Sequence, residues 1–133
     1  MNVVIDTNVL VSALLNADGV PAKILNLVFE RKINIVCDSR LVSEYNNVLH
    51  RAKFSFATEL INSILGFIVM ESVFVKALPC ELEFSDNDDK KFYEVFNTKQ
   101  ADFLITGNIK HFPIEKNIVN PKTFYDFYNT GNK

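Results

Sequence analysis

Short runs of β-branched and other apolar residues alternate along the chain with longer segments in which apolar residues recur at helical spacing. The runs predict strands over residues 3–5, 33–37, 72–77, 103–105 and 117–119. The helical spacing predicts helices over residues 8–15, 21–32, 39–52 and 56–70, a helix opened by Asp86 or Asn87, and a last helix over residues 121–128. Ser39 is expected to be the N-cap of the third of these helices.

Strands separated by helices are typical of right-handed βαβ crossovers. The pattern therefore predicts an α/β fold, a three-layer α/β/α sandwich around a mainly parallel central sheet. The sequence has no internal repeat, linker or low-complexity stretch, so we expect a single domain over residues 1–133.

Composition narrows the class of protein. The chain has 133 residues, 48% of them hydrophobic, and a formal net charge of −2. The balance of 14 basic and 16 acidic residues disfavours a strongly basic nucleic-acid module. Cys37 and Cys80 form no local metal motif, which favours reduced thiols in a cytoplasmic protein. The longest uncharged apolar segment, residues 64–70, is too short to cross a membrane, so no membrane partner is expected.

Acidic and amide side chains fall at one edge of the predicted sheet. Asp6 directly follows the first strand, and Asn108 follows the fourth. Glu44 lies in the helix after the second strand, while Asp88 and Asp89 open the helix before the fourth. Sites in open parallel sheets gather outside the carboxyl ends of the strands, which is where all five residues are expected.

Each of these acids alone has a simpler interpretation, as a turn former or as a complement to a helix dipole. Their convergence favours a cation, because clustered carboxylates repel each other. Oxygen ligands without nearby His or Cys favour Mg²⁺ or Mn²⁺. Asp102 precedes the fourth strand, so we expect it at the opposite edge of the sheet, outside the site.

Four blocks in order resemble the PIN-domain family of metal-dependent nucleases. They are Val-Ile-Asp6-Thr7-Asn8, Ser39-Arg-Leu-Val-Ser-Glu44, Asp86-Asn-Asp88-Asp89 and Ala101-Asp102-Phe-Leu-Ile-Thr106-Gly-Asn108, the last followed by His111-Phe112 and Val119-Asn-Pro121. The resemblance covers nearly the whole chain and is closest to the toxin components of bacterial toxin–antitoxin pairs. It implies a single PIN-like domain over residues 1–133.

The resemblance implies an endoribonuclease that hydrolyses RNA phosphodiester bonds with Mg²⁺ or Mn²⁺. Asp6, Glu44 and Asp89 are then the expected metal ligands and, with Asn108, the expected catalytic residues. The supporting residues are Asn8, expected to hydrogen-bond a carboxylate, Thr106, expected to orient a ligand or water, and Asp86 and Asp88. The expected partners are RNA, a cognate antitoxin protein and, as a homodimer, a second copy of the chain.

Two features leave alternatives open. Many members of the family have an Asp where this chain has Asn108, which offers one neutral oxygen and holds a second metal more weakly. A catalytically weak or inactive PIN-like module that binds RNA or protein is therefore the main alternative. The apolar residues between Phe54 and Met70 cover more than one helix stripe, which favours either a buried helix or a groove for a partner.

Two other enzyme classes place an Asp after a first strand. The haloacid-dehalogenase phosphatases need a second Asp where this chain has Asn8, and Asn cannot act as their general acid. A receiver domain needs its acidic pair and its phosphate acceptor on separate strands and a Lys after the last strand. Asp6 with Asp88 or Asp89 matches that arrangement poorly, so both classes remain minor alternatives.

Overall fold

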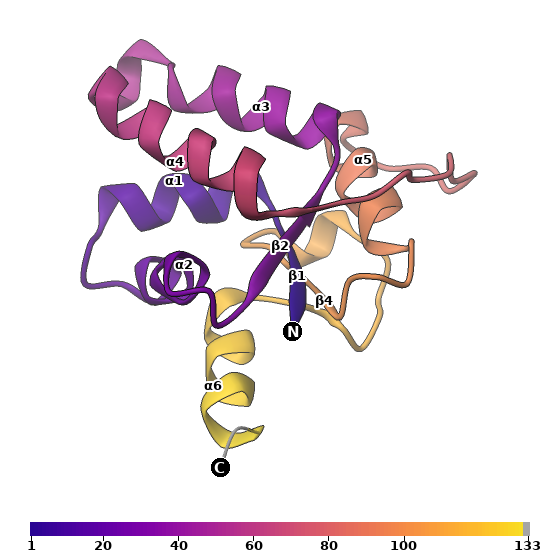
Figure 1. Cartoon of the computed structure of the whole chain (residues 1–133). Helices are drawn as coiled ribbons and strands as arrows, with labels where there is room; N and C mark the ends of the chain where they lie inside the picture. The colour runs from indigo at the N-terminus through magenta and orange to yellow at the C-terminus, as the bar shows by residue number, and fades with distance from the viewer. Residues whose placement is uncertain (132–133) are drawn as a thin grey trace.

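The computed structural model describes residues 1–131, in which six helices surround a five-stranded sheet (Figure 1). The strands are β1 (Asn2–Ile5), β2 (Asn34–Cys37), β3 (Val73–Phe74), β4 (Phe103–Ile105) and β5 (Ile118–Val119). The helices are α1 (Thr7–Leu15), α2 (Val20–Phe29), α3 (Ser39–Leu49), α4 (Thr58–Glu71), α5 (Asn87–Phe96) and α6 (Pro121–Gly131). Short 3₁₀ turns cover Ala52–Phe54 and Ile109–His111.

The sheet has the order β3-β2-β1-β4-β5, and every neighbouring pair is parallel. The chain builds outward from β1 through β2 to β3, then returns to the other side of β1 for β4 and β5. The strand order therefore reverses between β1 and β4, the position where open α/β sheets bind ligands. The predicted α/β fold with a parallel central sheet is confirmed.

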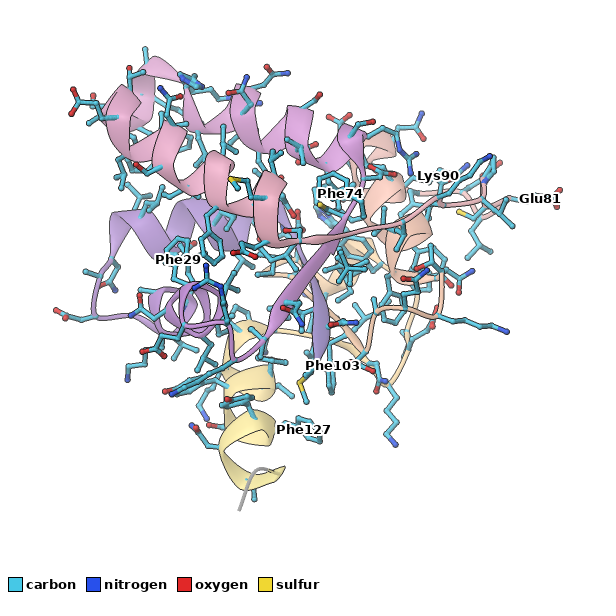
Figure 2. All side chains as sticks on the ribbon, in the orientation of Figure 1. Phe29, Phe74, Glu81, Lys90, Phe103 and Phe127 are labelled. Carbon is cyan, nitrogen blue, oxygen red and sulfur yellow. The ribbon has the colours of Figure 1, made fainter. Side chains whose placement is uncertain are left out.

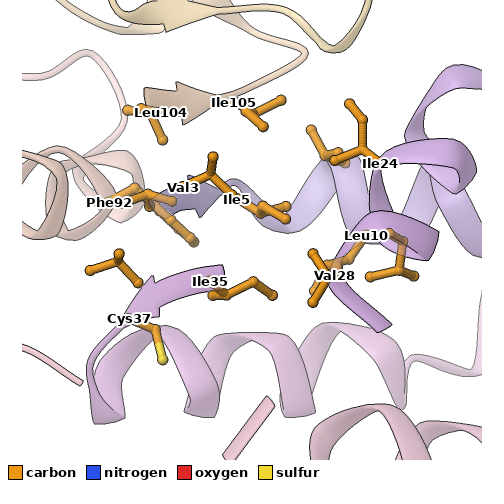
Figure 3. Close-up of a cluster of buried hydrophobic side chains, with 14 of the residues drawn as sticks. Val3, Ile5, Leu10, Ile24, Val28, Ile35, Cys37, Phe92, Leu104 and Ile105 are labelled. Atoms are coloured by element: carbon orange, nitrogen blue, oxygen red, sulfur yellow. The ribbon is translucent and has the colours of Figure 1, made fainter. Parts of the chain in front are cut away.

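Apolar side chains fill both faces of the central strands. Val3 is fully buried, with Phe92 of α5 close to it on one face of the sheet. Leu10 of α1 and Ile24 and Val28 of α2 pack on the other face (Figure 3). Because both faces are covered, the strands are continuous apolar runs rather than alternating ones, as parallel strands between helices require.

The predicted third strand is too long. The strand predicted over residues 72–77 is limited to Val73–Phe74, while the helix before it, predicted over about residues 56–70, covers Thr58–Glu71. β3 is an edge strand with a neighbour on one side only, and Leu78, beyond its end, is 78% exposed. Pro79 also lacks the N–H that a ladder needs.

The predicted N-cap of α3 is also wrong. Asp38 is the cap: its carboxylate accepts hydrogen bonds from the backbone N–H groups of Arg40, at 2.9 Å, and Leu41, at 3.2 Å. Asp38 also forms an ion pair with the Arg40 guanidinium at 2.8 Å. Ser39 is the first helical residue instead. The carboxylate prevails over the hydroxyl because one of its oxygens reaches two unsatisfied N–H groups.

The apolar helix α4 was expected to be either buried or part of a groove for a partner, and the structure shows both buried and exposed apolar residues on it. Ile61, Ile64 and Ile68 are buried against the body of the protein. Val69 and Met70 are exposed, at 52% and 84%, on its outer side. Helix α4 lies beside α3 in Figure 1. Within residues 1–131 no helix is long and apolar enough to span a membrane.

Replacing the cap tests the assignment of Asp38. Asp38→Ala removes two backbone hydrogen bonds and an ion pair, so we expect it to lower the free energy of unfolding by about 1–2 kcal/mol. Ser39→Ala is the matched control and is expected to change it by less than about 0.5 kcal/mol. Urea denaturation of the three proteins measures both effects, and an equal loss in the two variants contradicts the assignment.

Candidate active site

An acid-lined pocket of about 370 Å³ opens at the carboxyl ends of the strands, next to the point where the strand order reverses. It is hereafter called the acid pocket. Its lining residues are Asp6, Thr7, Asn8, Val11, Ser12, Glu44, Val48, Arg51, Phe54, Asp86, Asp88 and Asp89. The structure thus brings together five acidic residues from three separate segments of the chain.

Asp6 is the deepest acid of the pocket, with 4% of the residue exposed. Its carboxylate accepts a hydrogen bond of 2.7 Å from the hydroxyl of Thr106, which is fully buried. The Thr106 hydroxyl in turn accepts a hydrogen bond of 2.9 Å from the backbone N–H of Asn108. The loop after β4 therefore fixes the side chain at the end of β1.

Glu44 reaches the pocket because α3 is tied to the end of β1. The hydroxyl of Tyr45, which is fully buried, donates a hydrogen bond of 2.5 Å to the carbonyl oxygen of Ile5. The Glu44 carboxylate accepts a hydrogen bond from the hydroxyl of Thr7 and forms an ion pair of 2.5 Å with the ammonium of Lys91. Lys91 comes from α5, so this contact joins α3 to α5.

The start of α5 supplies the remaining acids. Asp86 is the N-cap of α5 and accepts a hydrogen bond of 2.9 Å from the backbone N–H of Asp88. The side chain of Asp88 is 84% exposed, while that of Asp89 is only 13% exposed and turns inward. Nδ1 of His111 lies 3.0 Å from an Asp89 carboxylate oxygen.

Burial and mutual repulsion make ionisation of these acids costly. Burial, together with the negative charges of Asp89 and Glu44, raises the pKa of Asp6 to about 6, against the lowering effect of the Thr106 hydrogen bond. Burial also raises the pKa of Asp89, despite the opposing contact with His111. A bound cation relieves repulsion of this kind.

The carboxylate oxygens suit a hard divalent cation, but they are not gathered in one coordination shell. Within residues 1–131 no group of three or more His, Cys, Asp or Glu side chains lies close enough to hold a metal ion by itself. Glu44 is turned to Lys91, and Asp89 to His111. Mg²⁺ is usually held by only one or two carboxylates, with waters and substrate phosphates completing the shell. The donor set therefore fits Mg²⁺ or Mn²⁺ as a partly protein-bound ion.

Asn8, predicted as a supporting residue, and Asn108, predicted as a catalytic one, do not contact the acids of the pocket through the side-chain hydrogen bonds of the described residues. Asn8 does line the pocket, but its side-chain oxygen accepts a hydrogen bond of 3.3 Å from the backbone N–H of Gly107 rather than contacting a carboxylate. Asn108 faces an adjoining pocket that it shares with Lys110, His111 and other residues of the 3₁₀ turn. The amide thus lies beside the acid pocket and not among its lining residues.

Asp102 lies at the other edge of the sheet, as predicted. Its carboxylate accepts a hydrogen bond of 2.8 Å from the backbone N–H of Asn2, at the amino end of β1.

Sequence reasoning missed Thr7, Arg51 and Phe54 as parts of the acid pocket. Thr7 could have been found from the sequence, because it directly follows Asp6. Arg51 and Phe54 carried no such signal, because the turn after α3 brings them there.

Comparison with known proteins agrees with this geometry. The family model described as PIN domain matches residues 2–110, which includes every acid of the pocket. An uncharacterized protein of Methanocaldococcus jannaschii is 34% identical over 111 residues, which cover 81% of this chain and 71% of that protein. No solved structure matches the chain. PIN domains are generally nucleases and typically use divalent metals. On the family match and the relative together, this chain belongs to the PIN domain family.

Proposed function

We propose that this protein is a divalent-metal-dependent endoribonuclease and the toxin of a toxin–antitoxin pair. The observation that carries the nuclease proposal is the convergence of Asp6, Glu44 and Asp89 on one pocket, from the end of β1, the middle of α3 and the start of α5. Membership of a family whose members are generally nucleases supports the same reaction class.

Asp6, Glu44 and Asp89 would hold Mg²⁺ or Mn²⁺. When bound, such an ion lowers the pKa of a water ligand and neutralises charge on the scissile phosphate. Asn108 lies outside the acid pocket and adds no negative charge to it. The absence of a carboxylate at position 108 therefore favours one bound ion over two.

The chain's own residues would orient the site and balance its charge. Thr106 holds the Asp6 carboxylate in one rotamer, so that its second oxygen stays directed to the pocket. Lys91 and His111 contribute cationic or donor groups beside Glu44 and Asp89. The RNA phosphates would meet these groups and Arg51 at the rim of the pocket.

The toxin role rests on the resemblance of the motifs and on exposed apolar side chains of α4 and β3, which an antitoxin would cover in part. Leu60, Val69 and Met70 of α4 and Phe74 of β3 are between 45% and 84% exposed. A second copy of the chain is the other partner that these side chains would contact. A PIN-like module that binds RNA or protein without cleavage is the alternative function, and it predicts no dependence on divalent metal.

Replacing the deepest acid tests the nuclease proposal. Asp6→Asn keeps the size of the side chain and its contact with Thr106 but removes the charge, so we expect loss of at least about 10²-fold in RNA cleavage with Mn²⁺. Asp102→Asn is the matched control, since Asp102 lies at the opposite edge, and should cleave like the wild type. Cleavage of a labelled RNA measures both, and undiminished cleavage by Asp6→Asn would contradict the site.

The raised pKa of Asp6 predicts a stability effect that does not depend on activity. Because the pKa is about 6 in the folded chain and 3.8 in the unfolded chain, ionisation of Asp6 destabilises the protein as pH rises from about 4 to 6. This amounts to at most about 3 kcal/mol at pH 7. In EDTA, Asp6→Asn should therefore be more stable than the wild type by about 1–3 kcal/mol at pH 7 and nearly equal to it at pH 4.

Addition of Mn²⁺ at pH 7 completes that measurement. We expect Mn²⁺ to raise the melting temperature of the wild type, because an ion that binds only the folded state stabilises it, and to leave Asp6→Asn unchanged. The outcome against the proposal is a Mn²⁺ effect of the same size in both proteins, which would assign binding to another part of the chain.

Controlled expression in a bacterium without the cognate antitoxin tests the toxin role. We expect wild-type protein to arrest growth and Asp6→Asn, produced at the same level, to be tolerated, because toxicity follows from RNA cleavage. If cells grow normally with the wild type although the purified protein cleaves RNA, the protein is a nuclease but not a toxin.

A further inference from the structure

We propose that the segment from Arg51 to Phe56 is a base-stacking site for single-stranded RNA, with Phe54 as the ring that receives the base. This inference rests on the proposed nuclease function and names the form of its substrate. Phe54 is the aromatic residue among those that line the acid pocket, where it shares the space with Asp6, Glu44 and Asp89.

An RNA strand that leaves the acid pocket along α3 would pass this segment. Arg51 lines both the acid pocket and an adjoining groove of about 500 Å³ along α3. Glu44, Val48 and Asp88 line both spaces as well, so the two are continuous. A phosphate at the acids therefore places the neighbouring nucleotide beside Arg51 and Phe54.

The two rings of the segment form a small aromatic platform. Phe54 and Phe56 are stacked, with ring centroids 5.5 Å apart and planes inclined by 14°. Ser55 between them has a φ of 54° and lies in the left-handed region, which non-glycine residues rarely adopt. The turn is closed by hydrogen bonds of the Ser55 backbone N–H and hydroxyl to the carbonyl oxygen of Ala52.

The two rings are anchored on the body of the protein but keep part of their surface exposed. Phe54 and Phe56 pack against a buried cluster of Val11, Leu49 and Ile61, yet both rings remain half-buried. The left-handed Ser55 ends the 3₁₀ turn and so sets the positions of the two rings at the rim of the acid pocket. A rigid ring also loses little entropy when a base stacks on it.

The charges around the rings favour a nucleic acid over an apolar peptide. The Lys53 ammonium lies 5.1 Å from the centroid of the Phe54 ring. Arg51, two residues earlier in the sequence, is exposed. Aromatic rings flanked by cations are the usual means of binding single strands, where bases stack and phosphates meet Lys or Arg. A base within a duplex is already stacked and does not reach such a ring.

Fluorescence anisotropy with a labelled single-stranded RNA, in EDTA so that nothing is cleaved, tests the proposal. We expect Phe54→Leu to weaken binding by about 5- to 100-fold, since Leu keeps the apolar packing but loses the ring face. Phe54→Tyr should restore affinity to within about threefold of the wild type. Phe127→Leu is the matched control: Phe127 is a 47% exposed ring beside Phe103, away from the acid pocket (Figure 2), and should have no effect.

Removal of single bases from the RNA locates the contact even if Phe54→Leu does not fold. We expect wild-type binding to fall at one abasic position and to be nearly unchanged at the others, and Phe54→Leu to lose this dependence. Equal tolerance of abasic sites at all positions, or wild-type affinity in Phe54→Leu, would overturn the proposal and leave charge alone as the basis of binding.

Cleavage of the same RNA with Mn²⁺, run in parallel, separates this inference from the function it rests on. If the wild type cleaves RNA but its binding does not depend on Phe54, the nuclease proposal stands and the stacking site is rejected. If binding depends on Phe54 but no RNA is cleaved, the stacking site stands and the nuclease proposal is rejected.

Discussion

Repulsion between carboxylates at the end of the central strand is the constraint on which the rest of the site depends. β1 is paired on both sides and covered on both faces, so the residue that follows it enters an apolar environment. That residue is Asp6, and Glu44 and Asp89 add further negative charge nearby. Such an arrangement lowers the stability of the free protein, which natural chains tolerate mainly where function requires it.

Contacts within the chain limit the cost of this repulsion. Thr106 donates to Asp6, Thr7 and Lys91 hold Glu44, and His111 lies against Asp89. Each acid thus has its own donor, and the donors come from four different elements of the fold. The same contacts keep the three carboxylates out of a single coordination shell. An ion that enters the pocket must compete with Lys91 and His111, so its affinity reflects the difference between two sets of contacts.

The sequence predicted the edge of the sheet at which the acids meet, because that edge follows from strand order and helix direction alone. Asp6 and Asp89 were placed correctly on this ground, and Asp102 was excluded on the same ground. The partners of the acids were not predictable, since the contact of Lys91 with Glu44 depends on how α3 and α5 approach each other. The cap of α3 was missed because Asp and Ser both cap helices well, and only geometry decides between them.

The formal net charge of −2 gave the least guidance to function, because it averages over the whole chain and does not register the acids that gather in one pocket. Five acids line one pocket, while Arg51 and Lys53 stand at one side of it and Lys110 and His111 at another. In the proposed function, affinity for RNA would come from a few contacts near the reacting phosphate, from a bound cation and from the proposed base stacking, rather than from a broad basic surface. Binding that depends on few phosphates would be less sensitive to salt than that of a basic module, and a stacking ring would favour single strands.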